Sequence, residues 1–526
     1  MHGDSFYSQS DNYASRSVRS LRAGMRFAAV ARMPEEHYET PSLRQLAKRA
    51  RADLAQMAYP SKPWVQPRSH HPGQDVLDVV IVGGGQSGLA CALALIRDGI
   101  SNILVLDRNP AGFEGPWETY ARMVELRTPK FSVGMEMGIP NLSVRAWHAA
   151  KYGDQAWSDI ERVARTDWMA YLRWFRQVTR LPVQNDTALL TIAPTDDLIE
   201  LRVRDRDDEK TLITRKVVLA TGFDGGGEWH IPDFIRGHVP PDRLTHSNVV
   251  FDPARVKGLR VGVLGHGASA FDMAGAMLAA GAASVDLCYR RPQIPTVNPH
   301  RWIESAGFLK HYPELPDPIR WELAVYFDSV DQPPTQKSFD RACAYPNFHR
   351  HEGTPWQSIA MRGEVIAVQT PARAFTFDFV VAATGSRSDL SARPELAAFA
   401  DRILLWRDQY QPPPALAHHG LERQPYLGVN YEFVGRDAAD SAWLTNIYAY
   451  NFASYVSQGP HSTSISGHKH SLPRVIRSIT RSLFAEQRND LITALKCFQE
   501  PELIIPPAAT DAAADYASTP AFQLAK

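Results

Sequence analysis

Runs of apolar residues that end in glycine recur along the chain and predict buried strands leading into helices. Val76–Val82 is such a run, and glycines and a helical pattern of small residues follow it. A second run with the same continuation begins at residue 259, and the two segments form an imperfect internal repeat with an offset of 182 residues. Each copy therefore predicts a βαβ unit with parallel strands.

A helix is predicted ahead of the first unit. Thr40 can cap it, Pro41 suits its first turn, and the pattern stops before Pro60. Residues 1–38 are polar and irregular, and the Pro-rich stretch 60–72 is interpreted as a linker. The apolar positions at helical spacing are Leu43, Leu46, Ala47, Ala50, Leu54 and Met57.

Two further apolar strands end in the same way, as VVLATG (217–222) and VVAATG (380–385). Because the two units are not contiguous, the simplest architecture inserts the second dinucleotide domain into the first. The predicted fold class is α/β with two Rossmann-like domains and an N-terminal helical extension. The expected division is 1–74 for the arm, helix and linker, 75–256 for the first part of domain one, 257–375 for domain two with a Pro- and aromatic-rich insert at 292–358, and 376–526 for the rest of domain one and C-terminal helices, including one near 471–487.

Composition limits the classes of function. The 526 residues include 57 Lys and Arg against 57 Asp and Glu, which argues against a nucleic-acid partner or an anionic membrane. No apolar run reaches the length of a membrane-spanning helix, so no membrane association is expected. Residues 14–32 are rich in Arg and Ser, as in an organellar transit peptide, but the expected location is cytoplasmic.

The cysteines and histidines offer little metal or thiol chemistry. Cys91 and Cys288 lie in apolar runs and are expected in the core. The nearest approach to a metal pair is His349 and His351, which we assign to a polar loop around Arg350, and no metal is expected. No Cys-x-x-Cys pair occurs among the four cysteines, which are Cys91, Cys288, Cys343 and Cys497.

The first glycine-rich turn has the residues that a pyrophosphate requires. Gly83, Gly85 and Gly88 suit a tight turn, close approach of a ligand and close packing of helix on strand. Ser87 can add a hydroxyl, and the next strand ends at Asp107, whose carboxylate can accept hydrogen bonds from a ribose. The alternative is an ordinary tight βα turn with a solvated acid at the end of its strand.

The second turn places Gly265, Gly267 and Ala270 at the equivalent positions, and Ser269 is expected to contact the pyrophosphate of a second dinucleotide. Two such turns in register, each between a strand and a helix, are a strong dinucleotide-binding signal.

The strand after the second turn ends differently from the first. Tyr289 stands at the position of Asp107 and is expected to stack on adenine, and Arg290 and Arg291 follow it. A carboxylate there would repel a 2′-phosphate, whereas guanidinium groups pair with it, so the second site is predicted to select NADP over NAD. The alternative is that both arginines merely solvate the strand end.

These motifs resemble the two-dinucleotide flavoprotein monooxygenases: flavin-containing monooxygenases, Baeyer–Villiger monooxygenases and amine N-hydroxylases. The resemblance covers residues 75–490 and rests on GGGQSG (83–88), GHGASA (265–270) and both Ala-Thr-Gly turns. DFVVAATG (378–385) and RTDWMAYLRWF (165–175) are similar to segments of the N-hydroxylases. The resemblance implies that the first turn holds FAD and that the nested turn holds NADPH.

Two departures narrow the resemblance. The Phe-x-Gly…His fingerprint of flavin-containing and Baeyer–Villiger enzymes is matched only at stretched spacing, by Phe234, Gly237, His246 and Phe251. The segment LRTPK (126–130) lacks the Asn that sulfide- and amine-oxidising enzymes place near the flavin. We therefore favour the N-hydroxylase variant.

The resemblance also implies a reaction. NADPH reduces the flavin, O₂ adds to give a C4a-hydroperoxyflavin, and one oxygen atom passes to a small-molecule nucleophile, with an amine nitrogen of an amino acid or related amine favoured. The alternatives are a Baeyer–Villiger or sulfide-oxidising monooxygenase, an NADPH oxidase or reductase, and a non-catalytic flavin-binding protein. The expected partners are the small-molecule substrate and O₂, and homo-oligomerisation is left open.

Candidate active-site residues come from three segments. Arg127 and Lys130 can stabilise reduced flavin or bind a substrate carboxylate, or they are charges of a solvated turn. Asn451, in a segment similar to the flavin-contacting region of relatives, is a substrate contact or a buried structural amide, and a loop around Ser457 can offer N–H groups to the flavin. Trp117 lies near the isoalloxazine or in the core. The other cofactor-binding candidates are Arg108, Thr221, Thr384, Gly385 and Gln458.

The insert 292–358 is too long for a βα loop. We expect a lid or substrate-access element, or a surface that docks another subunit.

Overall fold

The computed structural model describes residues 38–71, 73–131 and 134–504, so nearly all of the predicted arm, including the basic segment 14–32, lies outside the described residues. The first described helix, α2 (Pro41–Gln56), begins at Thr40, whose hydroxyl accepts a hydrogen bond from the Leu43 N–H at 3.2 Å. The predicted apolar positions from Leu43 to Leu54 are buried. Met57 is 49% exposed, because it caps the helix instead of continuing its apolar face.

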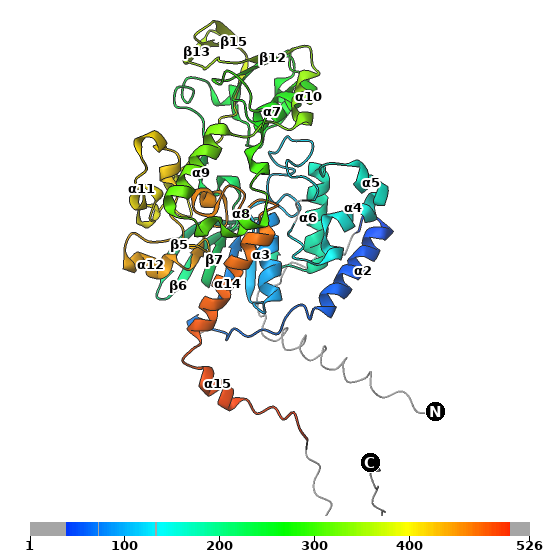
Figure 1. Ribbon diagram of the computed structural model, residues 1–526, viewed down its shortest axis with the longest axis vertical. Coiled ribbons are helices and arrows are strands. Elements are labelled where there is room, and N and C mark those ends of the chain that lie inside the picture. Colours follow the sequence, from blue (N-terminus) through cyan, green and yellow to red (C-terminus); the bar gives the residue numbers. More distant parts are fainter. Residues whose placement is uncertain (1–37, 72, 132–133, 505–526) are drawn as a thin grey trace, which may run out of the picture. The chain divides into compact units, whose positions relative to one another are not determined.

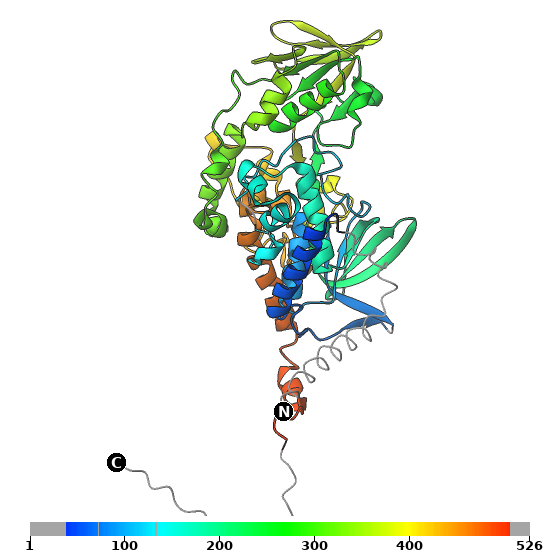
Figure 2. The same cartoon turned by 90° about the vertical axis from the view of Figure 1, so that its right-hand side faces the viewer.

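An eight-stranded sheet forms the first domain (Figures 1 and 2). The predicted repeat supplies β2 (Gln74–Val82), α3 (Gln86–Arg97) and β3 (Ile103–Leu106), and both β3 and β7 (Asp208–Leu219) pair with β2 in parallel. The antiparallel strands beyond β7 are β6 (Leu198–Asp205) and β5 (Thr187–Thr195). The remaining strands are β1 (Ser69–His71) beside β2, β4 (Val183–Gln184) beside β3 and β18 (Ile447–Tyr448) beside β7.

A parallel five-stranded sheet forms the second domain, in the order β12–β11–β10–β16–β9. Its repeat unit consists of β10 (Arg260–Leu264), α7 (Ala268–Ala279) and β11 (Ser284–Cys288). The other strands are β9 (Leu244–His246), β12 (Phe348–His351) and β16 (Phe379–Ala382). The two sheets confirm the α/β fold class with one dinucleotide domain inserted into the other.

The second sheet extends beyond the expected boundaries of 257–375. The strand ending in VVAATG was expected in the returning first domain, but as β16 it pairs in parallel with β10, from Val261–Phe379 to Leu264–Ala382. On its other side β16 pairs with β9, which precedes residue 257. The chain returns to the first sheet only later, where Ile447 of β18 pairs with Val217.

The remaining helices and strands belong to neither of these two sheets. The insert contains α8 (Ala306–His311), α9 (Asp317–Val330) and α10 (Gln336–Cys343), and α10 contacts α7 (Figure 1). Small sheets are β13 (Ser358–Arg362) with β14 (Val365–Gln369) and β15 (Ala374–Phe377), and β8 (Gly227–Trp229) with β17 (Ser386–Ser388). The other helices are α4 (Val144–Tyr152), α5 (Asp154–Asp159), α6 (Arg165–Thr179), α11 (Trp406–Gln409), α12 (Ala438–Leu444), α13 (Tyr455–Gln458), α14 (His468–Glu486) and α15 (Leu491–Cys497).

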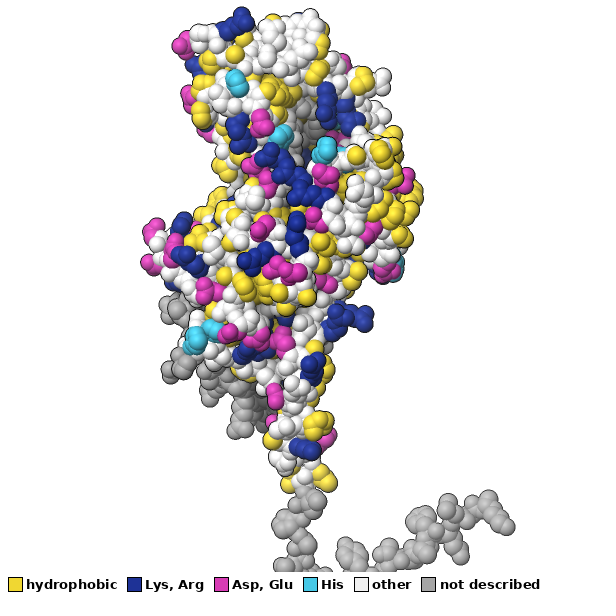
Figure 3. All heavy atoms as spheres, turned by 90° about the vertical axis from the view of Figure 1, so that its left-hand side faces the viewer, with side chains coloured by type: hydrophobic (Ala, Val, Ile, Leu, Met, Phe, Trp, Pro, Cys, Tyr) yellow, Lys and Arg dark blue, Asp and Glu magenta, His cyan; other side chains and the backbone are white. Residues whose placement is uncertain are grey.

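The described surface carries both signs of charge. On the face drawn in Figure 3, Lys and Arg side chains lie among Asp, Glu and His side chains, as the balanced composition predicts. Among the described residues, no helix combines the length and the apolar character needed to cross a bilayer.

Candidate active site

The first glycine turn joins β2 to α3. Gly83 has a φ of +109°, and a Cβ there would lie 2.4 Å from the carbonyl oxygen of Ala220, the first residue of the Ala-Thr-Gly turn at 220–222. A Cβ on Gly88 would lie 1.8 Å from the carbonyl oxygen of Gly83. Glycine at these two positions is therefore required by the protein's own packing.

The second turn repeats this arrangement between β10 and α7. Gly265 has a φ of +139°, and a Cβ there would lie 2.3 Å from the carbonyl oxygen of Ala383 in the other Ala-Thr-Gly turn. Ala270, the counterpart of Gly88, is buried in the helix. Each strand end thus lies against its own Ala-Thr-Gly turn.

Gly85 and Gly267 have no comparable packing requirement. They are the N-caps of α3 and α7, with φ values of −72° and −69° that any residue can adopt. A Cβ on Gly85 would approach the Gly115 backbone no closer than 3.9 Å, and one on Gly267 would meet no atom within 4 Å. The N-terminus of α7 therefore faces open space, and a side chain at the N-terminus of α3 would only touch the Gly115 backbone. Both positions fit a pyrophosphate that approaches the helix N–H groups.

Ser87 of the first turn has a partner that the sequence analysis did not identify. Its hydroxyl lies 2.9 Å from Nε2 of His468, the first residue of α14. His468 is completely buried, and burial lowers its pKa to about 4. A neutral imidazole therefore orients this hydroxyl at the predicted phosphate site.

We expect acid to destabilise the folded protein through His468. In the unfolded chain its pKa is about 6.5, so between pH 6.5 and pH 4 the unfolded state binds a proton that the folded state excludes, and stability falls as the pH falls. When the two states differ by one full proton, each pH unit inside this window lowers the free energy of unfolding by about 1.4 kcal/mol. Urea unfolding midpoints at pH 7.5 and pH 5 test this, with His468→Gln as the non-titrating comparison. An equally steep acid loss in His468→Gln would contradict the assignment.

Asp107 follows β3, as expected, and lies against the first turn. Its carboxylate accepts hydrogen bonds from the backbone N–H groups of Gly84 and Asn109, each at 2.8 Å. Burial raises its pKa, and the two N–H donors oppose that shift. The ribose contact stays a prediction. Arg108 is exposed and forms an ion pair with Asp224 at 3.7 Å.

The two arginines after β11 differ in their surroundings. Arg290 is exposed and has no hydrogen bond or ion pair with any described residue, whereas Arg291 donates to the Ser329 carbonyl at the end of α9. Arg290 is thus the guanidinium free to meet a phosphate at this strand end. Tyr289 is only 1% exposed and belongs to the core of the second domain, so the expectation that it stacks on adenine is wrong.

Asn451 and Thr221, predicted from distant segments, lie together. Asn451 is 1% exposed; its amide nitrogen donates to the Thr221 hydroxyl at 3.0 Å, and its amide oxygen accepts the Ala453 N–H at 2.9 Å. Both ends of the amide are therefore bound within the protein, as in the structural alternative, and its substrate contact stays a prediction. In the second domain, the Thr384 hydroxyl donates to the His230 carbonyl and Gly385 has a φ of +76°.

Trp117 is buried beside the first turn. Its ring lies edge-on to that of Trp168 on α6, with centroids 6.4 Å apart, and Trp168 in turn donates to the side chain of Gln86 at 3.1 Å. Only one aromatic ring therefore separates Trp117 from the first glycine turn. This position leaves both of its predicted roles open.

Arg127 and Lys130 point to different parts of the molecule. Arg127 lies 3.4 Å from the Ser269 hydroxyl and 3.3 Å from the buried carboxylate of Asp272, so it reaches the N-terminal turn of α7. Lys130 donates to the carbonyls of Trp157 and Ser158 near the end of α5. The structure brings Arg127, but not Lys130, together with the second dinucleotide turn, and the binding of a substrate carboxylate by either residue stays a prediction.

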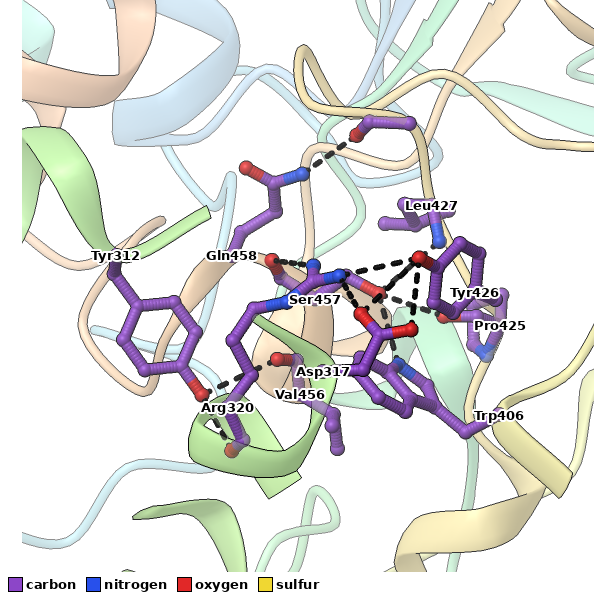
Figure 4. Close-up of polar contacts among 11 residues, drawn as sticks. Tyr312, Asp317, Arg320, Trp406, Pro425, Tyr426, Leu427, Val456, Ser457 and Gln458 are labelled. Carbon is purple, nitrogen blue, oxygen red and sulfur yellow. Dashed lines mark hydrogen bonds and ion pairs between the residues drawn. The ribbon is translucent and has the colours of Figure 1, made fainter. Parts of the chain in front are cut away.

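Gln458 ends α13, a short helix where a loop was expected (Figure 4). Its side chain is 2% exposed, and Nε2 donates to the Gly428 carbonyl at 2.7 Å. Because a carbonyl can only accept, this contact fixes the orientation of the amide. Its Oε1 is buried without a partner among the described residues, so it can accept a hydrogen bond from an N–H group of a bound ligand.

The two histidines considered as a metal pair, His349 and His351, also differ from expectation. His349 and His351 lie on strand β12 and not in a polar loop, because β12 pairs in parallel with β11. His351 lies 2.7 Å from the Asp286 carboxylate. The described residues contain no cluster of three or more His, Cys, Asp or Glu side chains suited to a metal ion.

The four cysteine thiols do not pair with one another. Cys91 and Cys288 are buried, as predicted, and Cys343 and Cys497 are exposed. All four lie within the described residues and are unpaired. No dithiol is therefore available for disulfide chemistry.

Comparison with known proteins places this geometry in a class. A family described as pyridine nucleotide-disulphide oxidoreductase matches residues 80–307. Ornithine hydroxylase of Pseudomonas aeruginosa has a TM-score of 0.61 at 17% identity, covering 78% of this chain and all of that one. The FAD-bound cadaverine monooxygenase of Erwinia amylovora has a TM-score of 0.59 at 16% identity, covering 77% and 95%. The fold is that of the two-dinucleotide flavoprotein monooxygenases.

A sequence relative identifies the family more narrowly. The FAD-dependent urate hydroxylase of Xanthomonas campestris pv. campestris is 41% identical over 463 residues, which span 88% of this chain and 98% of the relative. The chain belongs to this family of FAD-dependent hydroxylases. It is therefore a flavin-dependent oxidoreductase, as the sequence motifs predicted.

Proposed function

We propose that the protein is an FAD- and NADPH-dependent hydroxylase that transfers one oxygen atom of O₂ to urate. The observation that carries the two-cofactor assignment is the absence of crowding at Gly85 and Gly267, since the packing of the described residues requires glycine at neither position. Identity of 41% along nearly the whole of both chains supports urate as the substrate.

The chain's own residues have distinct parts in this proposal. The N-termini of α3 and α7 bind the two pyrophosphates, Ser87 adds a hydroxyl at the first, and Arg290 binds the 2′-phosphate of NADPH. Arg127 adds positive charge at the second turn, and this charge attracts the anionic pyrophosphate. When bound, the flavin accepts hydride from NADPH and activates O₂, and the protein orients the partners and excludes water.

Amine N-hydroxylation is the second candidate. The segments DFVVAATG (378–385) and RTDWMAYLRWF (165–175) favour it, since both are similar to segments of the N-hydroxylases. In that case Arg127 or Lys130 would pair with the carboxylate of an amino-acid substrate.

The test is coupled turnover. We expect urate to stimulate NADPH oxidation by the flavin-loaded protein and to lower the hydrogen peroxide released per NADPH, because oxygen then passes to the substrate. Ornithine, lysine and polyamines serve as the comparison. Stimulation and coupling by an amine, with no response to urate, would replace urate by the amine class; peroxide release equal to NADPH consumption with every compound would indicate an oxidase.

A further inference from the structure

Two histidines from distant segments are stacked on each other: His300 is buried, and the side chain of His461 is 17% exposed. His300 lies in a short helical turn of the insert, and His461 follows α13. Their ring centroids are 4.7 Å apart with an interplanar angle of 15°. His300 also lies against the ring of Phe327 on α9, with centroids 5.1 Å apart.

Both imidazoles have hydrogen-bonding capacity that the protein leaves unused. Burial lowers the pKa of His300 to about 4 and that of His461 to about 3, so both rings are neutral at physiological pH. A neutral imidazole carries one donor and one acceptor nitrogen. The Nδ1 atom of each ring is buried and has no hydrogen-bond partner among the described residues. The Glu304 carboxylate lies 3.8 Å from Nδ1 of His461, which is beyond hydrogen-bond distance. A buried polar atom without a hydrogen bond lowers the stability of the folded protein unless a ligand or a water molecule binds it.

The pair lies where three candidate segments meet. Arg301, next to His300, donates to the backbone carbonyl of Arg127 at 2.8 Å. Asp331, whose charge acts on His300, lies 3.3 Å from His266 of the second glycine turn. The pair is therefore connected to the loop 126–130, to the second dinucleotide turn and to the C-terminal segment that carries Gln458.

A polar network holds the C-terminal segment around Ser457 in place against the insert (Figure 4). The Arg320 guanidinium, on α9, donates to the Ser457 carbonyl at 3.0 Å, and the Tyr312 hydroxyl donates to the Val456 carbonyl at 3.2 Å. The Ser457 hydroxyl accepts hydrogen bonds from Trp406 and from the Leu427 N–H. Insert and C-terminal segment are thus fixed to each other, so the two imidazoles are held by both elements.

We infer that His300 and His461 bind the substrate, and that their stacked rings select a planar ring bearing N–H and carbonyl groups. This inference rests on the proposed function and specifies its substrate site. A ring N–H can donate to one imidazole while a ring carbonyl accepts from the other, and urate offers both on one edge. An alkylammonium offers donors only, so it has no group that could accept a hydrogen bond from the second imidazole.

The test compares four variants of the flavin-loaded protein: His300→Phe, His461→Phe, His300→Asn and His300→Gln. Phe keeps a flat ring and removes the nitrogens, and we expect a roughly tenfold rise in the Kd and KM for urate from the lost hydrogen bond. Asn places an amide atom near the position of Nδ1 and is expected to retain tighter binding than Gln, which places it near Nε2. The KM for NADPH and anaerobic flavin reduction should stay at parental values.

Urate binding is measured by titrating the oxidised protein and following the flavin spectrum, and turnover by NADPH oxidation. If the parent binds and hydroxylates urate but both Phe variants match it, this inference is overturned and the proposed function stands. A rise in the KM for NADPH instead would place the pair at the nicotinamide and would also overturn it. If the parent neither binds nor hydroxylates urate, both proposals fail.

Discussion

Gly85→Ala is expected to weaken FAD binding, so that the purified protein carries less flavin than the parent. The methyl group would lie at the N-terminus of α3, where the pyrophosphate must approach the helix N–H groups. Hydrogen bonds to a charged group are worth about 1.5–3 kcal/mol each, so losing one weakens binding by roughly 10- to 150-fold. The folded protein should tolerate the change, because Gly85 has a φ of −72° and its Cβ would meet no protein atom closer than 3.9 Å.

The measurement is the flavin content of purified protein and the Kd for added FAD. Gly307→Ala is the matched control, since Gly307 is exposed on α8 and a Cβ there would meet no atom within 4 Å. Full flavin content in Gly85→Ala, equal to that of the control, would remove the first turn from the FAD site.

Arg290→Ala is expected to raise the KM for NADPH by roughly 10- to 150-fold, which corresponds to about 1.5–3 kcal/mol for a charge-assisted contact. The KM for NADH should change little, because NADH lacks the 2′-phosphate. Arg290 is exposed and has no hydrogen bond or ion pair with described residues that the substitution would break, so the loss reports on the ligand.

Arg291→Ala separates this effect from a general loss of charge. Arg291 already donates to the Ser329 carbonyl, so we expect a smaller change in the KM for NADPH. Steady-state kinetics with both coenzymes decide between the two arginines. Equal losses for NADPH and NADH in Arg290→Ala would show that this residue does not bind the 2′-phosphate.

Local signals predicted the parts of the fold that short-range physics determines. The cap at Thr40 and the apolar face of α2 are local, and so are the two strand–turn–helix units. The difference between the two strand ends, Asp107 in one and Tyr289 followed by Arg290 in the other, is also visible when the two copies of the repeat are aligned. Strand pairing is not local: β16 joins β10 across more than a hundred residues, so the boundary at 375 was placed too early.

The site was predicted less completely for the same reason. The contact of Arg127 with Asp272 and the stack of His300 on His461 join residues that share no sequence pattern. His468 lies next to Ser87 only because α14 starts at the first turn. Single histidines in polar segments carry no periodic signal, so their roles follow only from the folded structure.

The most direct test of the central claim is the origin of the oxygen atom in the product. The flavin-loaded protein is supplied with NADPH, urate and dioxygen labelled with the heavy isotope, and the product is analysed by mass spectrometry. We predict one labelled oxygen atom per product molecule, with NADPH consumed in equal amount. Product whose new oxygen comes from water, or unchanged urate with peroxide formed in proportion to NADPH, would contradict the account.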